Sequence, residues 1–267
     1  MSSDTTNLLC VFALGILVQG AHGQGPADAS SKRPFVNTLG MNFIPLPNVT
    51  AEKSQNLMSI WDTRVRDYSE FCSATGTIQD SPKFKQGVND PVVYISWNQA
   101  REFCGWLTTN DQAAGLISPH SRYRLPTDRE WSCAVGLCGL EKEFPSPKAA
   151  SRKFKRRPWG ERIKPPNDFA NLGPSWHIDK FRYTSPVGSF RANKYGFYDM
   201  TGNVVQWCED RYDPGEKVDP IHGATRVIRG SDWSYWSHDP IYLSDRDGLG
   251  EQDRGDWVGF RCVLEVK

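Results

Sequence analysis

The sequence predicts an α+β fold in which two to three helices come early and much irregular chain follows. Amphipathic helical spacing is confined to residues 63–136. Beyond Gly136 the chain consists of short strand-like segments separated by Gly, Pro, Asn and Asp, which favour turns. Ten Trp among 32 aromatic residues supply large, flat side chains for the core of such a loop-rich fold.

The composition is that of an ordinary globular protein, with 38% hydrophobic and 24% charged residues. A chain of 267 residues forms one large domain or two small ones. The composition excludes a coiled coil, a repeat solenoid, a collagen and a polytopic membrane protein. The formal net charge of +1 provides no global field that would hold a nucleic acid or an acidic lipid surface. We therefore expect no nucleic-acid partner.

Residues 1–23 are predicted to form a secretory signal peptide. Residues 8–18 are the only sustained apolar run, too short to span a bilayer comfortably, and small residues follow at 21–23. The segment before this run contains Asp4 and no Lys or Arg, which signal peptides usually carry, so a membrane anchor stays open as the alternative. We expect a secreted or periplasmic protein with no membrane span after signal cleavage.

The remaining elements follow in order along the chain. Residues 24–37 are polar and lack periodicity, which predicts a linker before a domain at 38–267. Apolar residues and two prolines at 41–47 predict a short edge strand. Helices are predicted over 63–75 with Thr63 as a candidate N-cap, and over 96–109 with Ser96 as N-cap. A third begins at the capping box formed by Thr127 and Glu130.

A basic run occupies residues 152–157, where five of the six residues are Lys or Arg. No aromatic stacking platform interleaves with it. The run therefore predicts a solvated loop insertion rather than a nucleic-acid site.

A series of segments in consistent order resembles the sulfatase-modifying-factor domain, the family of formylglycine-generating enzymes. The resemblance covers roughly residues 38–265 and is specific because the segments occur together. The segments are GMNFIP (40–45), ISWNQA (95–100), FCGWL (103–107), YRLPTDREW (123–131), PWG (158–160), SPVGSF (185–190), NKYGFYDM (193–200), GNV (202–204), RVIRG (226–230) and VGFRCV (258–263). The resemblance implies a C-type-lectin-like fold of the formylglycine-generating-enzyme type, with helices beside small twisted sheets and much irregular chain.

The resemblance also implies two calcium sites. Irregular chain leaves backbone carbonyls that a hard cation with six to eight oxygen ligands can coordinate. The matching residues are Asn171, Leu172 (backbone), Asp179 and Phe181 (backbone) for the first site, and Asp199, Gly202 (backbone), Val204 (backbone) and Gln206 for the second. The family has Glu where this chain has Gln206. Turn formation by Asn and Asp near Gly is the metal-free alternative. We expect calcium as the cofactor.

The residues of the family's chemistry are missing. Oxygen-dependent formylglycine generation in the family depends on two cysteines that bind Cu(I), a soft ion that prefers thiolates. They lie between the Arg-x-x-Arg-Gly and Gly-Phe-Arg segments, and here that interval, residues 230–259, contains no cysteine. None of the five histidines has HxH or HxxxH spacing. We therefore predict no catalytic residue, no copper and no formylglycine generation.

The cysteines are predicted to be structural. Signal removal leaves six, an even number that favours disulfides in an exported chain. The resemblance implies a disulfide between Cys104 and Cys262. Cys133 matches a family cysteine whose usual partner is absent here; Cys138 is the candidate substitute, although five residues along a helix is poor disulfide geometry. The last two, at positions 72 and 208, stay unassigned, with free buried thiols as the alternative.

The interval without cysteines has the composition of a binding loop, rich in residues that give rigid contact area and adaptable hydrogen bonds. In family members this segment lines the substrate groove. The predicted ligand-binding residues are Asp232, Trp233, Tyr235, Trp236, His238, Tyr242 and Arg246. The alternative places Trp233 and Tyr242 in the core and leaves only the polar residues exposed.

Two functions therefore stay open. The first is an exported, calcium-stabilised binding module that recognises a protein, peptide or glycan through residues 232–247. Retroelement-diversified receptors, which use the same fold and vary the same interval, are a variant of this hypothesis. The second is an oxidoreductase of the family that acts on a cysteine or thiol substrate through a non-standard site.

Overall fold

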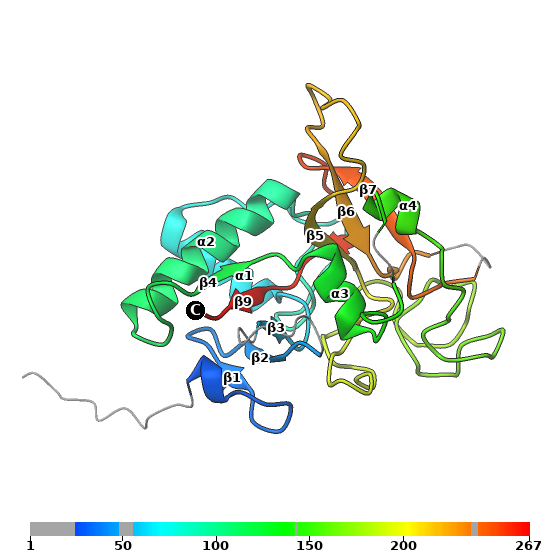
Figure 1. Ribbon diagram of the computed structural model, residues 1–267, viewed down its shortest axis with the longest axis horizontal. Helices are drawn as coiled ribbons and strands as arrows, with labels where there is room; N and C mark the ends of the chain where they lie inside the picture. The colour runs from blue at the N-terminus through cyan, green and yellow to red at the C-terminus, as the bar shows by residue number, and fades with distance from the viewer. Residues whose placement is uncertain (1–24, 48–55, 142–143, 236–239) are drawn as a thin grey trace, which may run out of the picture.

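The computed structural model describes residues 25–47, 56–141, 144–235 and 240–267. The predicted signal peptide at 1–23 lies outside these ranges. The described chain forms two small sheets, two long helices on one side and extensive irregular loops on the other (Figure 1). Within the same ranges, no helix combines the length and the apolar character that a membrane span needs.

The first sheet contains five short antiparallel strands in the order β1-β2-β3-β9-β4. The strands are β1 (Phe35–Val36), β2 (Asn42–Pro45), β3 (Leu57–Ser59), β4 (Arg122–Arg124) and β9 (Val263–Glu265). Phe43 pairs with Ser59, and Tyr123 pairs with Leu264 of the C-terminal strand. The predicted linker at 24–37 is therefore partly structured: the short helix η1 (Pro26–Asp28) lies within it, and Phe35 of β1 packs its ring against Phe43 at 6.2 Å.

The second sheet has the order β7-β6-β5-β8. Its strands are β5 (Val205–Arg211), β6 (Thr225–Arg229), β7 (Arg246–Gly250) and β8 (Val258–Gly259). β5 and β8 are parallel, and the other pairs are antiparallel. The connection between β5 and β6, residues 212–224, projects from the top of the molecule in Figure 1.

Two long helices pack against a core of aromatic side chains. α1 (Val65–Thr75) contributes Tyr68 and Phe71, and α2 (Trp97–Ala113) contributes Phe103. The rings of Tyr68 and Phe103 contact Phe260, and Phe71 lies edge-on to Phe103. The predicted N-cap of α2 is confirmed, because the Ser96 hydroxyl accepts from the N–H of Gln99 at 3.3 Å.

The N-cap of α1 is Arg64 rather than the predicted Thr63. Thr63 is extended chain whose N–H donates to the carbonyl of Phe260 and whose carbonyl accepts from Val92, both at 2.9 Å. Asp67 supplies the cap from inside the helix, because its carboxylate accepts the N–H of Arg64 at 2.9 Å. Pairing with neighbouring chain therefore overrides the capping preference of Thr.

A third, short helix connects the two sheets. α3 (Asp128–Ala134) begins at the predicted capping box, where the Thr127 hydroxyl accepts from the N–H of Glu130 at 3.1 Å. Burial opposes ionisation of Glu130, but two hydrogen bonds from Arg124, at 2.6 and 2.7 Å, keep the pKa of Glu130 below its usual value. A single turn, α4 (Pro147–Ala150), follows.

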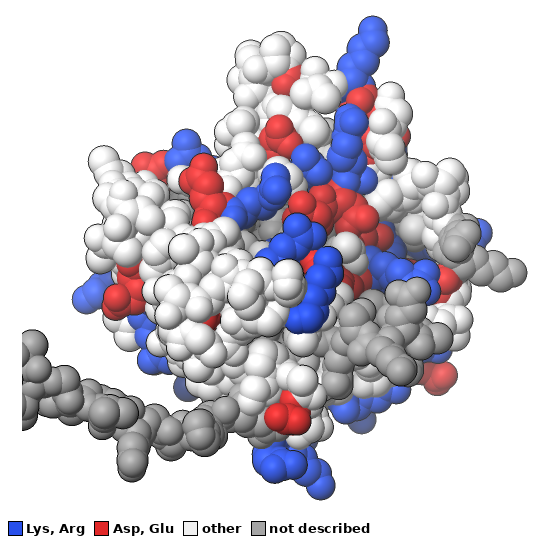
Figure 2. All heavy atoms as spheres, turned by 60° about the vertical axis from the view of Figure 1, so that its left-hand side comes forward, with Lys and Arg blue, Asp and Glu red and all other residues white. Residues whose placement is uncertain are grey.

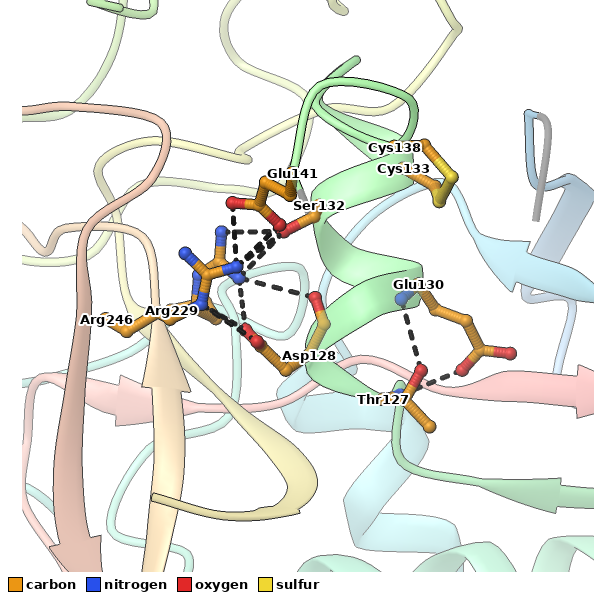
Figure 3. Close-up of a disulfide and its surroundings, with 9 residues drawn as sticks. All are labelled: Thr127, Asp128, Glu130, Ser132, Cys133, Cys138, Glu141, Arg229 and Arg246. Carbon is orange, nitrogen blue, oxygen red and sulfur yellow. Dashed lines mark hydrogen bonds and ion pairs between the residues drawn. A yellow bond between two sulfur atoms is a disulfide. The ribbon is translucent and has the colours of Figure 1, made fainter. Parts of the chain in front are cut away.

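One disulfide joins Cys133 to Cys138 beside α3 (Figure 3). The two cysteines do not share a helix, which would give poor disulfide geometry, because α3 ends at Ala134 and Gly136 turns the chain back with φ +82°. Cys138 is therefore the substitute partner of Cys133.

Two buried arginines pack against the other side of α3 (Figure 3). Arg229 of β6 is 1% exposed and Arg246 of β7 is 6% exposed. Both guanidinium groups bind the carboxylate of Asp128, Arg246 through its Nε at 2.8 Å. Arg246 also pairs with Glu141 at 2.7 Å, and both arginines donate to the Ser132 hydroxyl. These ion pairs attach the second sheet to α3.

The surface carries both charge signs side by side. On the face in Figure 2, acidic side chains gather in a hollow below the projecting β5–β6 connection, and basic side chains border them. This face therefore has no extended field of one sign, as the net charge of +1 suggests.

We predict that Asp128→Asn lowers the free energy of unfolding by about 3–5 kcal/mol, because two buried guanidinium groups lose a shared carboxylate. Urea unfolding measures this difference. Asp80→Asn is the control: it removes a surface ion pair with Arg254, which is expected to contribute at most about 1 kcal/mol. Equal effects of the two substitutions would contradict a structural role for the buried cluster.

Candidate functional site

A cavity of about 200 Å³ opens between the second sheet and the segment predicted to bind ligand. The sheet contributes Val205 of β5 and Ile228 of β6. The other lining residues are Arg152, Gly230, Ser231, Asp232, Tyr235, Ile241, Asp245, Arg246, Asp247 and Trp257. Three of the predicted ligand-binding residues, Asp232, Tyr235 and Arg246, therefore meet at one cavity.

The chain that follows β6 forms a preorganised wall of this cavity. Gly230, with φ +89°, turns the chain out of the strand. The Ser231 hydroxyl accepts from the N–H of Gly202 at 3.0 Å. Asp232 accepts from the N–H and hydroxyl of Ser234, at 2.7 and 2.6 Å. Burial raises the pKa of Asp232, which makes it a partly desolvated acceptor at the cavity.

Trp233 packs within the fold and holds the cavity wall in position through its indole. It is half-buried, and its indole N–H donates to the carbonyl of Asp256 at 2.9 Å. Its ring lies edge-on to Phe84 and Tyr183, which stack on each other with centroids 4.3 Å apart. The alternative in which Trp233 packs within the fold agrees better with this geometry than ligand contact does.

The remaining predicted loop residues do not line the cavity or cannot be placed. Tyr242 is half-buried, and its N–H donates to the Asp245 carboxylate at 2.9 Å. Trp236 and His238 lie outside the described residues.

Arg246 requires a correction. It lines the cavity, but Asp128, Glu141 and the carbonyl of Ser244 occupy its guanidinium group. The ion pairs that hold Arg246 in the sheet leave no free charge for a ligand. It is a structural residue rather than a ligand contact.

Asn203, which was not among the predicted site residues, joins three loops through its hydrogen bonds. Its N–H donates to the carbonyl of Asn171 at 2.8 Å, and its carbonyl accepts from the N–H of Trp233 at 3.0 Å. Its side chain binds both backbone groups of Ser185, at 2.9 and 3.0 Å. Its φ of +68° suits Asn better than most residues. The Gly-Asn pair at 202–203 was the available signal, because both residue types favour this conformation.

Gly173 brings the first predicted calcium loop against the cavity wall. A Cβ at this position would lie 2.0 Å from the carbonyl oxygen of Tyr235. Only glycine permits this approach. The Tyr235 ring packs in the same apolar cluster as Leu172 and Ile241.

The residues of the first predicted calcium set fit a hard cation. Asn171 is 1% exposed, and its amide N–H donates to the carbonyl of Tyr183 at 2.7 Å, while its Oδ1 is buried without a hydrogen-bond partner. The Asp179 carboxylate accepts from the N–H groups of Leu172 and Phe181, at 3.1 and 2.8 Å. Burial raises the pKa of Asp179. An unpartnered amide oxygen and a desolvated carboxylate on one loop are ligands that calcium prefers.

The second predicted set does not fit as predicted. Asp199 is buried, which raises its pKa to about 6, and its carboxylate accepts from the N–H of Gly188 at 2.8 Å. The Gln206 oxygen already accepts from Trp131 and Arg261, both at 2.8 Å. Its amide nitrogen donates to the carbonyl of Asp199, also at 2.8 Å. Gln206 is therefore a core hydrogen-bonding residue, and its oxygen has no capacity left for a cation.

The described residues offer no alternative metal site built from charged side chains. Among the residues that the structure describes, no three His, Cys, Asp or Glu side chains come together as a metal site. A cation at the first set would therefore depend on the amide and backbone oxygens that the resemblance implies.

The described cysteines lie away from the cavity. Cys104 and Cys262 are buried with their sulfurs 3.7 Å apart, so the structure brings the predicted pair together without the predicted bond. Cys208 is buried, and Cys72 is half-buried. Burial raises the pKa of Cys72, Cys104 and Cys208, which opposes formation of reactive thiolates.

Comparisons with known proteins agree with this architecture. Residues 24–266 match the family described as "Sulfatase-modifying factor enzyme 1-like domain". The formylglycine-generating enzyme of Mus musculus is 30% identical over 200 residues, which cover 66% of this chain and 45% of that protein. The inactive C-alpha-formylglycine-generating enzyme 2 of Mus musculus is 29% identical over 283 residues, which cover 91% of this chain and 79% of that protein.

The chain spans about half the length of the curated relatives that it matches first. The solved structure of PvdO from Pseudomonas aeruginosa is similar, with a TM-score of 0.59 at 23% identity, over 85% of this chain and 92% of that one. This likeness confirms the predicted C-type-lectin-like fold.

We predict that calcium raises the melting temperature and that Asp179→Asn removes most of this rise, because the loop loses a negatively charged ligand. Differential scanning calorimetry with calcium and with a chelator measures the rise. Asp168→Asn, which removes an exposed carboxylate from the same loop, is the control. An equal calcium-dependent rise in both variants would show that Asp179 is not a ligand.

Proposed function

We propose that this chain, which belongs to the Sulfatase-modifying factor enzyme 1-like family, is a non-catalytic binding module that acts outside the cytoplasm. Its cavity and the adjoining residues 232–247 recognise a protein, peptide or glycan. The observation that carries this proposal is the cavity lining, in which the residues that the structure describes include no thiol, imidazole or amine. Such a cavity offers hydrogen-bond acceptors and no nucleophile of those kinds.

The sequence supports the same conclusion across the full interval. Residues 230–259 contain no cysteine in the sequence, and residues 236–239, which lie outside the described ranges, are Trp, Ser, His and Asp. A Cu(I) centre of the family type needs thiolates there. Of the cysteines that the structure describes, Cys133 and Cys138 are joined in a disulfide, and the other four are absent from the cavity lining.

The size and polarity of the cavity indicate the kind of ligand. About 200 Å³ is below the roughly 300–1,000 Å³ of sites for drug-sized molecules, and it suits one amino-acid side chain or one sugar ring. Asp232 and Asp245 line it, and burial raises the pKa of both. Partly desolvated carboxylates make strong acceptors for hydroxyl, amide or ammonium donors.

Calcium is the proposed cofactor of this module. Asn171 and Asp179 would hold it, and the ion would supply positive charge and coordination for loop oxygens. Because Gly173 touches the backbone of Tyr235, a fixed calcium loop would fix the cavity wall as well. The ion would therefore act on binding through the scaffold, without contacting the ligand.

The alternative is an oxidoreductase that acts on a cysteine or thiol substrate through a non-standard site. The 30% identity to a protein named formylglycine-generating enzyme favours it. The 29% identity to a protein named as the inactive form, over 91% of this chain, favours the non-catalytic module.

Purified protein is predicted to convert no peptide cysteine to formylglycine, with or without added Cu(I), because the cavity has no thiolate to bind the metal. Mass spectrometry of a cysteine-containing peptide measures conversion, and the mouse formylglycine-generating enzyme is the positive control. Turnover together with stoichiometric copper would contradict the proposal. In parallel arrays of glycans and peptides, Asp232→Asn is expected to weaken binding at least tenfold, whereas Asp213→Asn on the β5–β6 connection leaves it unchanged.

A further inference from the structure

The positive charge of this chain is concentrated in one stretch of irregular chain. Residues 148–194 contain twelve of the 32 Lys and Arg but only three of the 31 Asp and Glu. The net charge of +1 therefore hides a local excess of nine positive charges. The densest part is the cationic loop, residues 152–164, with seven Lys and Arg and one Glu.

Few of these charges are neutralised within the protein. Arg152 is 3.8 Å from Asp245, and it is the one cation of the loop with an ion pair to a carboxylate in the described part of the chain. Five of the others are exposed: Lys153, Lys155, Arg156, Arg162 and Lys164. Cations that the fold leaves unpaired and exposed are positioned for an anionic partner.

Hydrogen bonds hold the backbone of the loop in place while its charges face outward. Phe154 exchanges two hydrogen bonds with the Ser244 hydroxyl, at 3.2 and 2.8 Å. The carbonyl of Arg156 accepts from the N–H of Leu243 at 2.9 Å, and the Ser151 hydroxyl donates to the carbonyl of Arg246 at 2.8 Å. The cationic loop is therefore fixed along the segment before β7, on the loop-rich side of the molecule in Figure 1.

The tip of the loop also presents an apolar side chain. Ile163 is 79% exposed and stands between Arg162 and Lys164. Its position is held from below, because the Trp159 indole donates to the carbonyl of Arg162 at 2.9 Å. The same indole packs edge-on against Phe169 and Trp176, in the apolar cluster that also contains Leu172 and Ile241. A packed tryptophan therefore fixes the backbone next to an isoleucine whose side chain is exposed to solvent.

We propose that the cationic loop docks the protein on an anionic membrane surface, with Ile163 inserted among the lipids and the surrounding cations on the headgroups. Stable attachment to a bilayer usually needs two signals, and a polybasic segment with an inserted apolar group supplies both. A soluble polyanion would use the charges but would give Ile163 no apolar environment. This inference is independent of the proposed function, because Ile163 and the five exposed cations that carry it do not line the cavity.

The test uses the full chain and vesicles of phosphatidylcholine, alone or in an equal mixture with phosphatidylglycerol, at about 0.15 M ionic strength. We expect sedimentation with the anionic vesicles only. The triple variant Lys153→Gln, Lys155→Gln, Arg156→Gln should bind about 100-fold more weakly. The variant Lys32→Gln, Arg33→Gln, Lys83→Gln removes the same charges elsewhere and should bind within about twofold of the parent.

A second pair of variants separates a membrane from a soluble polyanion. Ile163→Ser should weaken vesicle binding about tenfold, whereas Ile78→Ser, at another isoleucine that is 86% exposed, should not. No binding to anionic vesicles would overturn the proposal, as would equal losses in the two triple variants. Unchanged binding of Ile163→Ser together with competition by heparin would also overturn it, and would assign the loop to a soluble polyanion.

Discussion

The structure of the loop-rich half depends on the hydrogen bonds of one buried residue, Asn203. Irregular chain does not satisfy its own backbone donors and acceptors, so each buried loop needs a partner. Asn203 supplies partners to three loops at once: the backbone of Asn171, both backbone groups of Ser185 and the N–H of Trp233. It can do so because it adopts φ +68°, which turns its side chain and its backbone toward different neighbours.

Buried arginines satisfy backbone carbonyls in other parts of the irregular chain. Arg229 donates to the carbonyls of Leu243 and Asp245, and Arg261 donates to those of Ser59 and Tyr198. A guanidinium group carries five donors, so one side chain satisfies several loop carbonyls. The carboxylate of Asp128 pairs with Arg229 in the core, whereas burial raises the pKa of Asp62, 3.4 Å from Arg261, to about 8 and so favours its neutral form. The cavity is therefore bounded by loops whose positions depend on ionic and amide contacts more than on sheet pairing.

The sequence predicted what local chemistry decides. The N-caps of α2 and α3, Ser96 and Thr127, could be predicted because capping is an interaction within four residues. The fold class followed from the order of the helices and the family segments. The role of Thr63 was mispredicted because its partners, Phe260 and Val92, are distant in the sequence.

The candidate site was less predictable, because its residues are chosen by contacts across the fold. Gln206 and Arg246 have side chains that suit ligands, yet partners 55 to 118 residues away occupy them. Asp232 and Tyr235, which the composition of their segment singled out as ligand-binding residues, line a cavity, and their role in binding stays a prediction. The Gly-Asn pair at 202–203 indicated the turn, but the partners of Asn203 at Asn171, Ser185 and Trp233 are 18 to 32 residues away and follow from no local pattern.

The most direct test of this account is amide hydrogen exchange on Asn203→Gly. Glycine tolerates the backbone conformation of this position, so the substitution removes the side-chain contacts without adding strain. The account predicts faster exchange around 183–185, where the Ser185 backbone loses both of its side-chain partners, and around 171–173, where the Asn171 amide loses the Asn203 side-chain oxygen. Residues 231–235, which the backbone carbonyl of Asn203 holds through Trp233, and helices α1 and α2 should keep their protection. Faster exchange confined to residues 202–204 would contradict the claim that the Asn203 side chain holds neighbouring loops in place.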